Sequence, residues 1–160
     1  MNHLITLRVP ATSANLGSGF DAIGMAVSLY NIFKVIELRP AGEYEVEAHG
    51  EGSRELSSPK ANLVVKAYED TCERWKVKGP GFSLWCHNII PLCRGLGSSA
   101  GAVVAGVLIA KYLTGYEADE DELLRAMTVV EGHPDNVAPC YLGGMVVSCW
   151  DGQDLRYVNL

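Results

Sequence analysis

The amino-acid sequence predicts an α+β fold in which a mixed sheet packs in two layers against helices. The β-rich segments lie mainly before residue 50, and the helical patterns gather between residues 62 and 130. The regular strand–helix alternation that a doubly wound parallel sheet would need is missing. The chain has 160 residues, 48% of them apolar and 20% charged, which suits a folded domain with one core. We therefore expect residues 1–160 to form a single domain.

The N-terminal segments are expected to be strands. Residues 4–9 are rich in β-forming side chains, and this strand should end at the proline that follows. Residues 11–20 contain threonine, serine, asparagine and glycine, which predicts a loop. Strands are expected over residues 28–38 and 44–48, and the Pro-Ala-Gly-Glu run between them predicts a hairpin.

The first helical pattern begins at Asn62, after a polar connection at residues 50–60. Apolar residues recur from there to Trp75 with a period of about 3.6, which predicts a helix. A Gly-Pro-Gly run ends this helix, and residues 82–86 then alternate as a half-buried strand does.

The second half of the chain is expected to be mostly helical. Residues 100–113 are almost entirely apolar and predict a buried helix. A second helix is expected over residues 119–130, because its first turn is acidic and the helix dipole favours acidic side chains at an N-terminus. Residues 132–140 are short and polar and predict a loop, and residues 145–150 predict a last strand.

A glycine- and serine-rich segment leads the strand at residues 82–86 into the apolar helix. Gly95 and Gly97 allow the backbone to turn tightly and to approach a ligand closely. Ser98 and Ser99 fall where the first amides of a helix are unpaired, so their N–H groups and hydroxyls can face an anion such as a polyphosphate, and a hydroxyl there can also reach a Mg²⁺ bound to the phosphates. The residues expected to form this polyphosphate site are Pro91, Leu92, Cys93, Arg94, Gly95, Leu96, Gly97, Ser98, Ser99, Ala100 and Gly101.

A simpler alternative for this segment is a plain helix start, with glycines for a turn and a serine as N-cap. The block combines two glycines, two serines and a helix of small apolar residues, and that combination favours the phosphate site. The segment lacks the lysine of the G-x-x-x-x-G-K-[ST] loop, so it is a different kind of phosphate loop. Arg94 either adds positive potential near a γ-phosphate or is a solvated loop residue.

Charge and cysteine content restrict the expected partners and compartment. The net charge is −6 and the basic residues are scattered, so we expect no nucleic-acid partner. No apolar stretch reaches the ~20 residues of a membrane span, so we expect no membrane partner. The five cysteines are odd in number and lack C-x-x-C spacing, which indicates a reducing compartment without a disulfide frame or a zinc site. The first residues do not resemble a signal peptide, and we expect a cytoplasmic protein.

The pattern Pro91-x-x-x-Gly95-Leu96-Gly97-Ser98-Ser99-Ala100 resembles the second signature motif of the GHMP kinases, which phosphorylate small molecules such as galactose, homoserine and mevalonate. Two further blocks resemble the homoserine kinases of this family. They are VPATSANLGSGFD at residues 9–21 and EGHPDNVAP at residues 131–139. The resemblance implies the N-terminal, ribosomal-protein-like domain of a GHMP kinase.

The same resemblance implies an activity and a set of site residues. The activity is ATP-dependent phosphorylation of L-homoserine to O-phospho-L-homoserine, a step of threonine biosynthesis. Ser99 and Glu131 are expected to bind Mg²⁺, and Asp135 is the candidate general base because some relatives use an aspartate. Asn62 is expected near the adenine of ATP. The residues expected to hold homoserine are Asn15, Asp21, His133 and Asn136.

Several alternatives stay open at this stage. Asn15 and Asp21 also suit a turn held by its own side chains, and Asn62 suits a helix start. GHMP kinases have a second, C-terminal domain that residues 1–160 do not contain, so a catalytically silent nucleotide-binding fragment is one alternative function. Another small-molecule kinase of the mevalonate type is a second. A homodimer also stays open.

Overall fold

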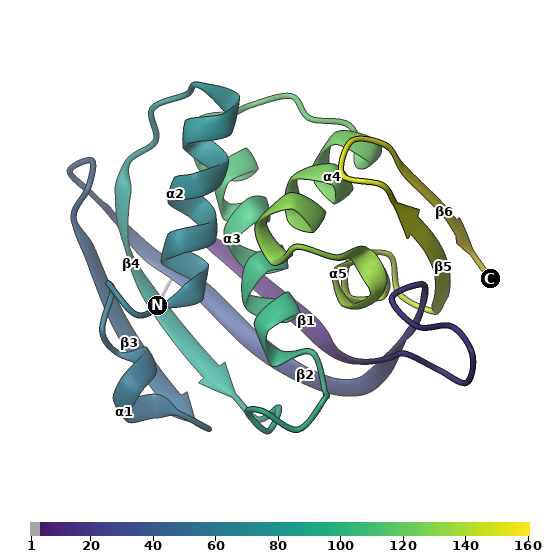
Figure 1. Cartoon of the computed structure of the whole chain (residues 1–160). Coiled ribbons are helices and arrows are strands. Elements are labelled where there is room, and N and C mark those ends of the chain that lie inside the picture. The colour runs from purple at the N-terminus through teal and green to yellow at the C-terminus, as the bar shows by residue number, and fades with distance from the viewer. Residues whose placement is uncertain (1–3) are drawn as a thin grey trace.

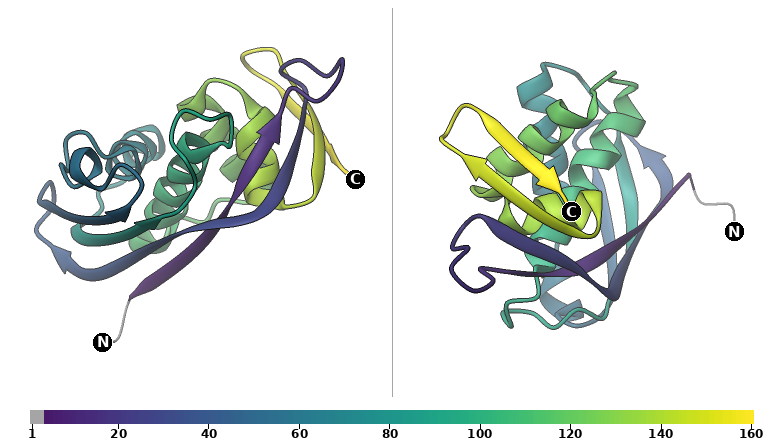
Figure 2. Two further views of the ribbon diagram at one scale, coloured as in Figure 1. Left: turned by 90° about the horizontal axis from the view of Figure 1, so that it is seen from below. Right: turned by 90° about the vertical axis from the view of Figure 1, so that its right-hand side faces the viewer.

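Helices cover one face of a mixed sheet, and in the described part of the chain the other face carries no helix (Figure 1 and Figure 2). The computed structural model describes residues 4–160. The strands are β1 (Ile5–Ala14), β2 (Ile23–Arg39), β3 (Tyr44–Gly50), β4 (Gly81–Asn88), β5 (Met145–Trp150) and β6 (Leu155–Asn159). The helices are α1 (Ser53–Leu56), α2 (Leu63–Trp75), α3 (Ser98–Thr114), α4 (Glu120–Glu131) and α5 (Pro134–Leu142). This two-layer arrangement confirms the predicted α+β class.

The long strand β2 organises the sheet. It pairs in antiparallel direction with β1, β4 and β5, and the order along the sheet is β3-β4-β2-β5-β6. Val35 of β2 pairs with Ile5 of β1 and with Leu84 of β4, so both edges of β2 are occupied there. Strand β3 therefore joins the sheet beside β4, in parallel direction. The predicted hairpin between residues 28–38 and 44–48 is wrong for this reason.

Two other expectations fail where proline or polar residues are misleading. Strand β1 does not end at Pro10 but continues to Ala14, with a register shift directly after the proline. A bulge on a strand that pairs on one side only is a place where proline is tolerated. Residues 132–140, expected as a loop, form most of α5, whose first residue, Pro134, has the fixed φ that suits the start of a helix. Helix α1 and strand β6 were not expected.

Helix α3 is the central element of the helical layer. It packs against α2 on one side and α4 on the other (Figure 1). Its buried residues, from Ala100 to Ala110, form the core together with side chains such as Phe33 and Leu84 from the inner face of the sheet. Because this burial fixes the helix along its length, the position of its N-terminus is fixed as well. Although α3 is apolar, no helix within residues 4–160 combines the length and composition that crossing a bilayer needs.

The contact between α2 and α3 depends on a glycine in the middle of α3. A Cβ atom on Gly106 would lie 2.5 Å from the carbonyl oxygen of Val64 and 2.6 Å from the Cβ of Ala67. Both neighbours belong to α2, and one of them is backbone, so neither can move without moving that helix. The two helices can approach this closely only because residue 106 has no side chain.

We predict that Gly106→Ala destabilises the protein, although alanine is the better helix former by about 1 kcal/mol. Overpacking of this kind costs about 1–3 kcal/mol. Urea unfolding followed by circular dichroism measures the change. The matched control is Gly101→Ala in the same helix, where the added Cβ would meet only Cγ2 of Val9, at 3.3 Å, and no backbone atom. If Gly106→Ala raised the unfolding midpoint, the close packing of α2 on α3 would be disproved.

Candidate nucleotide and acceptor site

The segment between β4 and α3 is held open by left-handed backbone conformations. Cys93, Gly95 and Gly97 have φ values of 54°, 70° and 61°. Gly97 is the N-cap of α3, and no side chain caps the first amides of the helix. The N-terminus of α3 therefore presents unpaired N–H groups and the positive end of the helix dipole, which together suit an anion.

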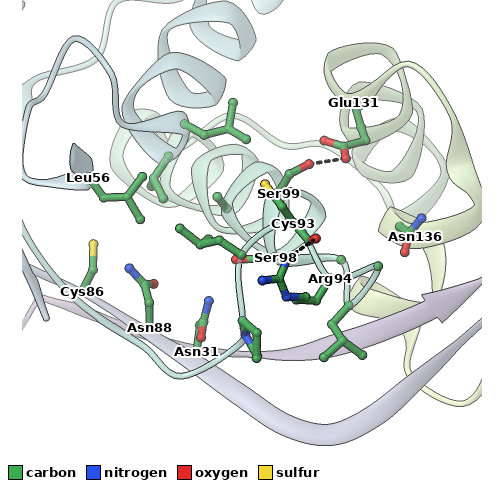
Figure 3. Close-up of a pocket in the computed structure, with 18 of the residues that line it drawn as sticks. Asn31, Leu56, Cys86, Asn88, Cys93, Arg94, Ser98, Ser99, Glu131 and Asn136 are labelled. Carbon is green, nitrogen blue, oxygen red and sulfur yellow. Dashed lines mark hydrogen bonds between the residues drawn. The ribbon is translucent and has the colours of Figure 1, made fainter. Parts of the chain in front are cut away.

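A cavity of about 500 Å³ runs along this segment (Figure 3). Its volume is in the range of small-molecule and cofactor sites. Residues from Pro91 to Ser99 form one wall. One end is lined by Asn31, Phe33, Leu56, Asn62, Cys86 and Asn88, and the other by Ala14, Asn15, Glu131 and Asn136. The cavity thus joins most of the predicted nucleotide residues to two of the predicted homoserine residues.

Two oxygen-bearing side chains meet at the start of α3. The hydroxyl of Ser99 donates a hydrogen bond to the carboxylate of Glu131 (Figure 3). Glu131 is the last residue of α4, and it reaches Ser99 because α4 packs beside α3. A carboxylate and a hydroxyl next to a phosphate site fit Mg²⁺, which takes few protein ligands when it also binds phosphates.

The buried carboxylate of Asp135 lies at the centre of a hydrogen-bond network. Its side chain is 1% exposed. One oxygen lies 2.5 Å from Nδ1 of His133 and accepts from Nδ2 of Asn136 at 3.3 Å, and the other accepts from Nδ2 of Asn15 at 3.3 Å. Helix α5 can approach the sheet this closely because Gly24 of β2 has no side chain. A Cβ atom there would lie 1.8 Å from the carbonyl oxygen of Asp135. The network joins the loop after β1 to α5 at the end of the cavity that Asn15 and Asn136 line.

The loop after β1 holds Asn15 in a fixed orientation. Asn15 and Asp21 both have positive φ, at 59° and 53°. The backbone N–H of Asp21 donates to Oδ1 of Asn15 at 2.8 Å, so the amide group of Asn15 is held at its oxygen by this loop and at its nitrogen by Asp135. The carboxylate of Asp21 is exposed and makes no hydrogen bond with the described residues of the network. Neither Asp21 nor His133 lines the cavity.

Four of the predicted nucleotide residues make contacts within the protein itself. Asn62 is the N-cap of α2, since its Oδ1 accepts from the Val64 amide, and it also lines the cavity. Arg94 lines the cavity from the exposed loop, and its guanidinium donates to the Cys93 carbonyl at 3.3 Å. Ala100 and Gly101 are buried in the first turn of α3 and do not line the cavity.

Two buried asparagines of the cavity were not predicted from the sequence. Asn31 is 1% exposed, and its Oδ1 accepts from the amides of Ile89 and Ile90, which fixes the end of β4 before the phosphate loop. Asn88, 4% exposed, lies beside it (Figure 3). The available signal was an asparagine inside an otherwise apolar strand pattern, because buried polar residues are uncommon there.

The thiol of Cys86 lines the same end of the cavity. Burial raises its pKa to about 12, and a hydrogen bond with Asn62 opposes part of this shift. Cys86 is therefore a neutral, poorly nucleophilic wall residue at physiological pH.

Residues 62–144, just over half of the chain, match the family of the GHMP kinases N terminal domain, and the chain belongs to this family. Among curated proteins, it is similar to the homoserine kinase of Carboxydothermus hydrogenoformans, with 46% identity over 158 residues that make up 98% of this chain and 51% of the relative. Among solved structures, the homoserine kinase of Cytophaga hutchinsonii superposes with a TM-score of 0.80 at 27% identity, over 100% of this chain and 53% of that one.

The mevalonate kinase of Methanococcus jannaschii has a TM-score of 0.74 at 16% identity, over 99% of this chain and 56% of that one. That likeness shows the shared fold. The chain spans about half the length of the curated relatives it matches.

Two glycines of the loop offer a matched pair of substitutions. Both have positive φ, but a Cβ on Gly95 would meet nothing within 4 Å, whereas a Cβ on Gly97 would lie 1.9 Å from Oγ1 of Thr12. We predict that Gly95→Ala costs about 1–2 kcal/mol from backbone conformation alone. Gly97→Ala should cost about 1–3 kcal/mol more because of the collision. Urea unfolding measures both, and equal costs would contradict the described packing of the loop on β1.

Proposed function

We propose that this chain carries the nucleotide-binding part of a homoserine kinase, in which the γ-phosphoryl group of ATP passes to the side-chain hydroxyl of L-homoserine. The observation that supports it is the continuity of one cavity. The phosphate loop lies in its middle, the Ser99–Glu131 pair beside the loop, and Asn15 and Asn136 at the acceptor end. The choice of homoserine as the acceptor is supported by the homoserine kinases among the similar proteins.

The triphosphate of ATP would bind along the segment from Pro91 to Ser99. The protein has a net charge of −6, so an anion must be attracted locally. The unpaired amides at the start of α3 provide that local potential, and the helix dipole adds to it. Arg94 is the one cation among the described lining residues and adds positive charge from the loop.

Ser99 and Glu131 would hold Mg²⁺ beside the phosphates. When bound, the ion neutralises charge on the β- and γ-phosphate oxygens. The contribution of the chain is to keep the two oxygen ligands together, one from each of two packed helices. Their hydrogen bond means that no large rearrangement is needed to assemble the pair.

The base of the nucleotide would occupy the end of the cavity near β4. Phe33 and Leu56 supply apolar contact there. Asn31 and Asn88 supply amide groups of buried side chains, so they can recognise the polar edge of a purine. Asn62 limits this end from the α2 side and keeps its capping role.

The acceptor amino acid would bind against Asn15 and Asn136, with Asp21 and His133 at the rim. Asn15 and Asn136 offer amides that can bind a carboxylate or a hydroxyl, and Asp21 offers an exposed carboxylate for an ammonium group. Asp135 would act through Asn15, His133 and Asn136, because its own oxygens are covered by these three donors.

A general base is not required by this arrangement. Asp135 was the candidate general base, but its carboxylate is buried and does not line the cavity. Phosphoryl transfer depends mainly on positioning and on charge stabilisation in a loose transition state. We therefore assign Asp135 the role of orienting the acceptor residues.

Calorimetric titration of this chain with ATP, with and without Mg²⁺, tests the metal assignment. Glu131→Gln and Ser99→Ala should each weaken ATP binding by on the order of tenfold in the presence of Mg²⁺, which corresponds to about 1.4 kcal/mol. Without Mg²⁺ their effect should be small. Glu43→Gln, on an exposed turn far from the cavity, is the control.

Two results would contradict the proposal. If the unmodified chain bound no nucleotide, the phosphate-site assignment would fail. If both substitutions left the Mg²⁺-dependent affinity unchanged, the metal pair would be wrong. In a protein of the relatives' length, the same substitutions should lower turnover by orders of magnitude, with L-homoserine accepted in preference to mevalonate.

A further inference from the structure

Thr12 is a fully buried polar residue that lies behind the cavity wall. It is 0% exposed and does not line the cavity. It belongs to the last part of β1, after the register shift that follows Pro10, and pairs with Ala26 of β2. A buried hydroxyl must be satisfied by a hydrogen bond, so its partners show which groups it holds.

The two polar groups of Thr12 bind two different parts of the site. Its backbone N–H donates to the carbonyl oxygen of Leu96 in the phosphate loop at 3.1 Å. Its hydroxyl donates to Oδ1 of Asn136 in α5 at 2.8 Å. One residue of a sheet strand is thus bonded to the nucleotide side and to the acceptor side of the cavity.

The carboxylate of Asp135 sets the orientation of the Asn136 amide, and the hydroxyl of Thr12 completes its hydrogen bonding. The nitrogen of that amide lies 3.3 Å from Oδ1 of Asp135, and a carboxylate oxygen can only accept. If the amide were turned over, its oxygen would face the carboxylate and two acceptors would oppose each other. With the nitrogen toward Asp135, the oxygen needs a donor on its other side, and the hydroxyl of Thr12 is that donor.

The phosphate loop also touches this hydrogen bond directly. A Cβ on Gly97 would lie 1.9 Å from Oγ1 of Thr12 and 3.1 Å from Oδ1 of Asn136. The left-handed turn at Gly97 is therefore packed onto both atoms of the bond. If the loop moved when phosphates bind, the positions of the Thr12 hydroxyl and of the Asn136 amide would change with it.

We propose that Thr12 is a positioning residue that couples the phosphate loop to the acceptor end of the cavity, by holding the Asn136 side-chain amide in place through the hydrogen bond to its oxygen. It touches neither ligand and acts through Asn136 and Leu96. The proposal adds to the proposed function a residue that makes acceptor binding depend on nucleotide binding, and it rests on that function only for the identity of the ligands.

The side-chain amide resonances of Asn136, observed by ¹⁵N NMR in this chain, test the coupling. In the unmodified protein and in Thr12→Ser, these resonances should be sharp and should shift when Mg²⁺–ADP is added. In Thr12→Val, which replaces the hydroxyl by a methyl group of similar size, they should move before any ligand is added. They should also lose the nucleotide-induced shift, while the affinity for Mg²⁺–ADP stays close to that of the unmodified chain.

The outcomes separate this proposal from the proposed function. If Mg²⁺–ADP does not bind the unmodified chain, the proposed function fails, and the ligand-free comparison of Thr12→Val with Thr12→Ser still decides whether the hydroxyl holds Asn136 in place. Unchanged Asn136 resonances in Thr12→Val, or equal changes in both variants, would overturn the proposal. If Thr12→Val does not fold, Thr12→Ala removes the same hydroxyl without a methyl group facing Gly97 and is judged by the same resonances.

Discussion

The burial of α3 is the constraint on which the rest of the site depends. Most of this helix is enclosed by α2, α4 and the sheet, so its axis cannot shift without opening the core. A helix fixed in this way presents its first amides at one defined place, directly after the left-handed turn at Gly97. The apolar interior thereby fixes the position of a polar group, the N-terminus of α3. Ser99 and Glu131 meet at the same place because α4 packs on the same buried helix.

A network of polar side chains adds to the constraint that the apolar core imposes. Asp135 is almost fully buried, and its oxygens are hydrogen-bonded to side chains from the loop after β1 and from the start of α5. Removing a donor from such a network would leave a buried charge partly unsatisfied, which is more costly than the bond itself is stabilising. The network therefore gives the acceptor end of the cavity a single arrangement. Thr12 ties that arrangement to the phosphate loop.

The sequence predicted the parts of the fold and site whose causes are local. The segment from Pro91 to Gly101 was predicted because the effects of its glycines and serines on the backbone depend only on near neighbours in the chain. The central helices were predicted because their apolar periodicity is strong. The parallel pairing of β3 with β4 was missed, since it depends on which edges of β2 are already occupied. Helix α5 was missed because its first turn contains the polar side chains of Asp135 and Asn136, which belong to the network. Thr12 and Asn136 are 124 residues apart, so no local pattern could relate them.

The central claim is that the buried helix α3 presents its N-terminus to the phosphates of a magnesium nucleotide. Backbone amide chemical-shift mapping of this chain during titration with Mg²⁺–ADP tests it most directly. The largest shifts are expected at Gly95, Gly97, Ser98 and Ser99, with a further change at Glu131 that requires Mg²⁺. Amides of β6, none of whose residues lines the cavity, should stay unchanged. The absence of shifts in the loop, or a response centred on β6, would contradict it.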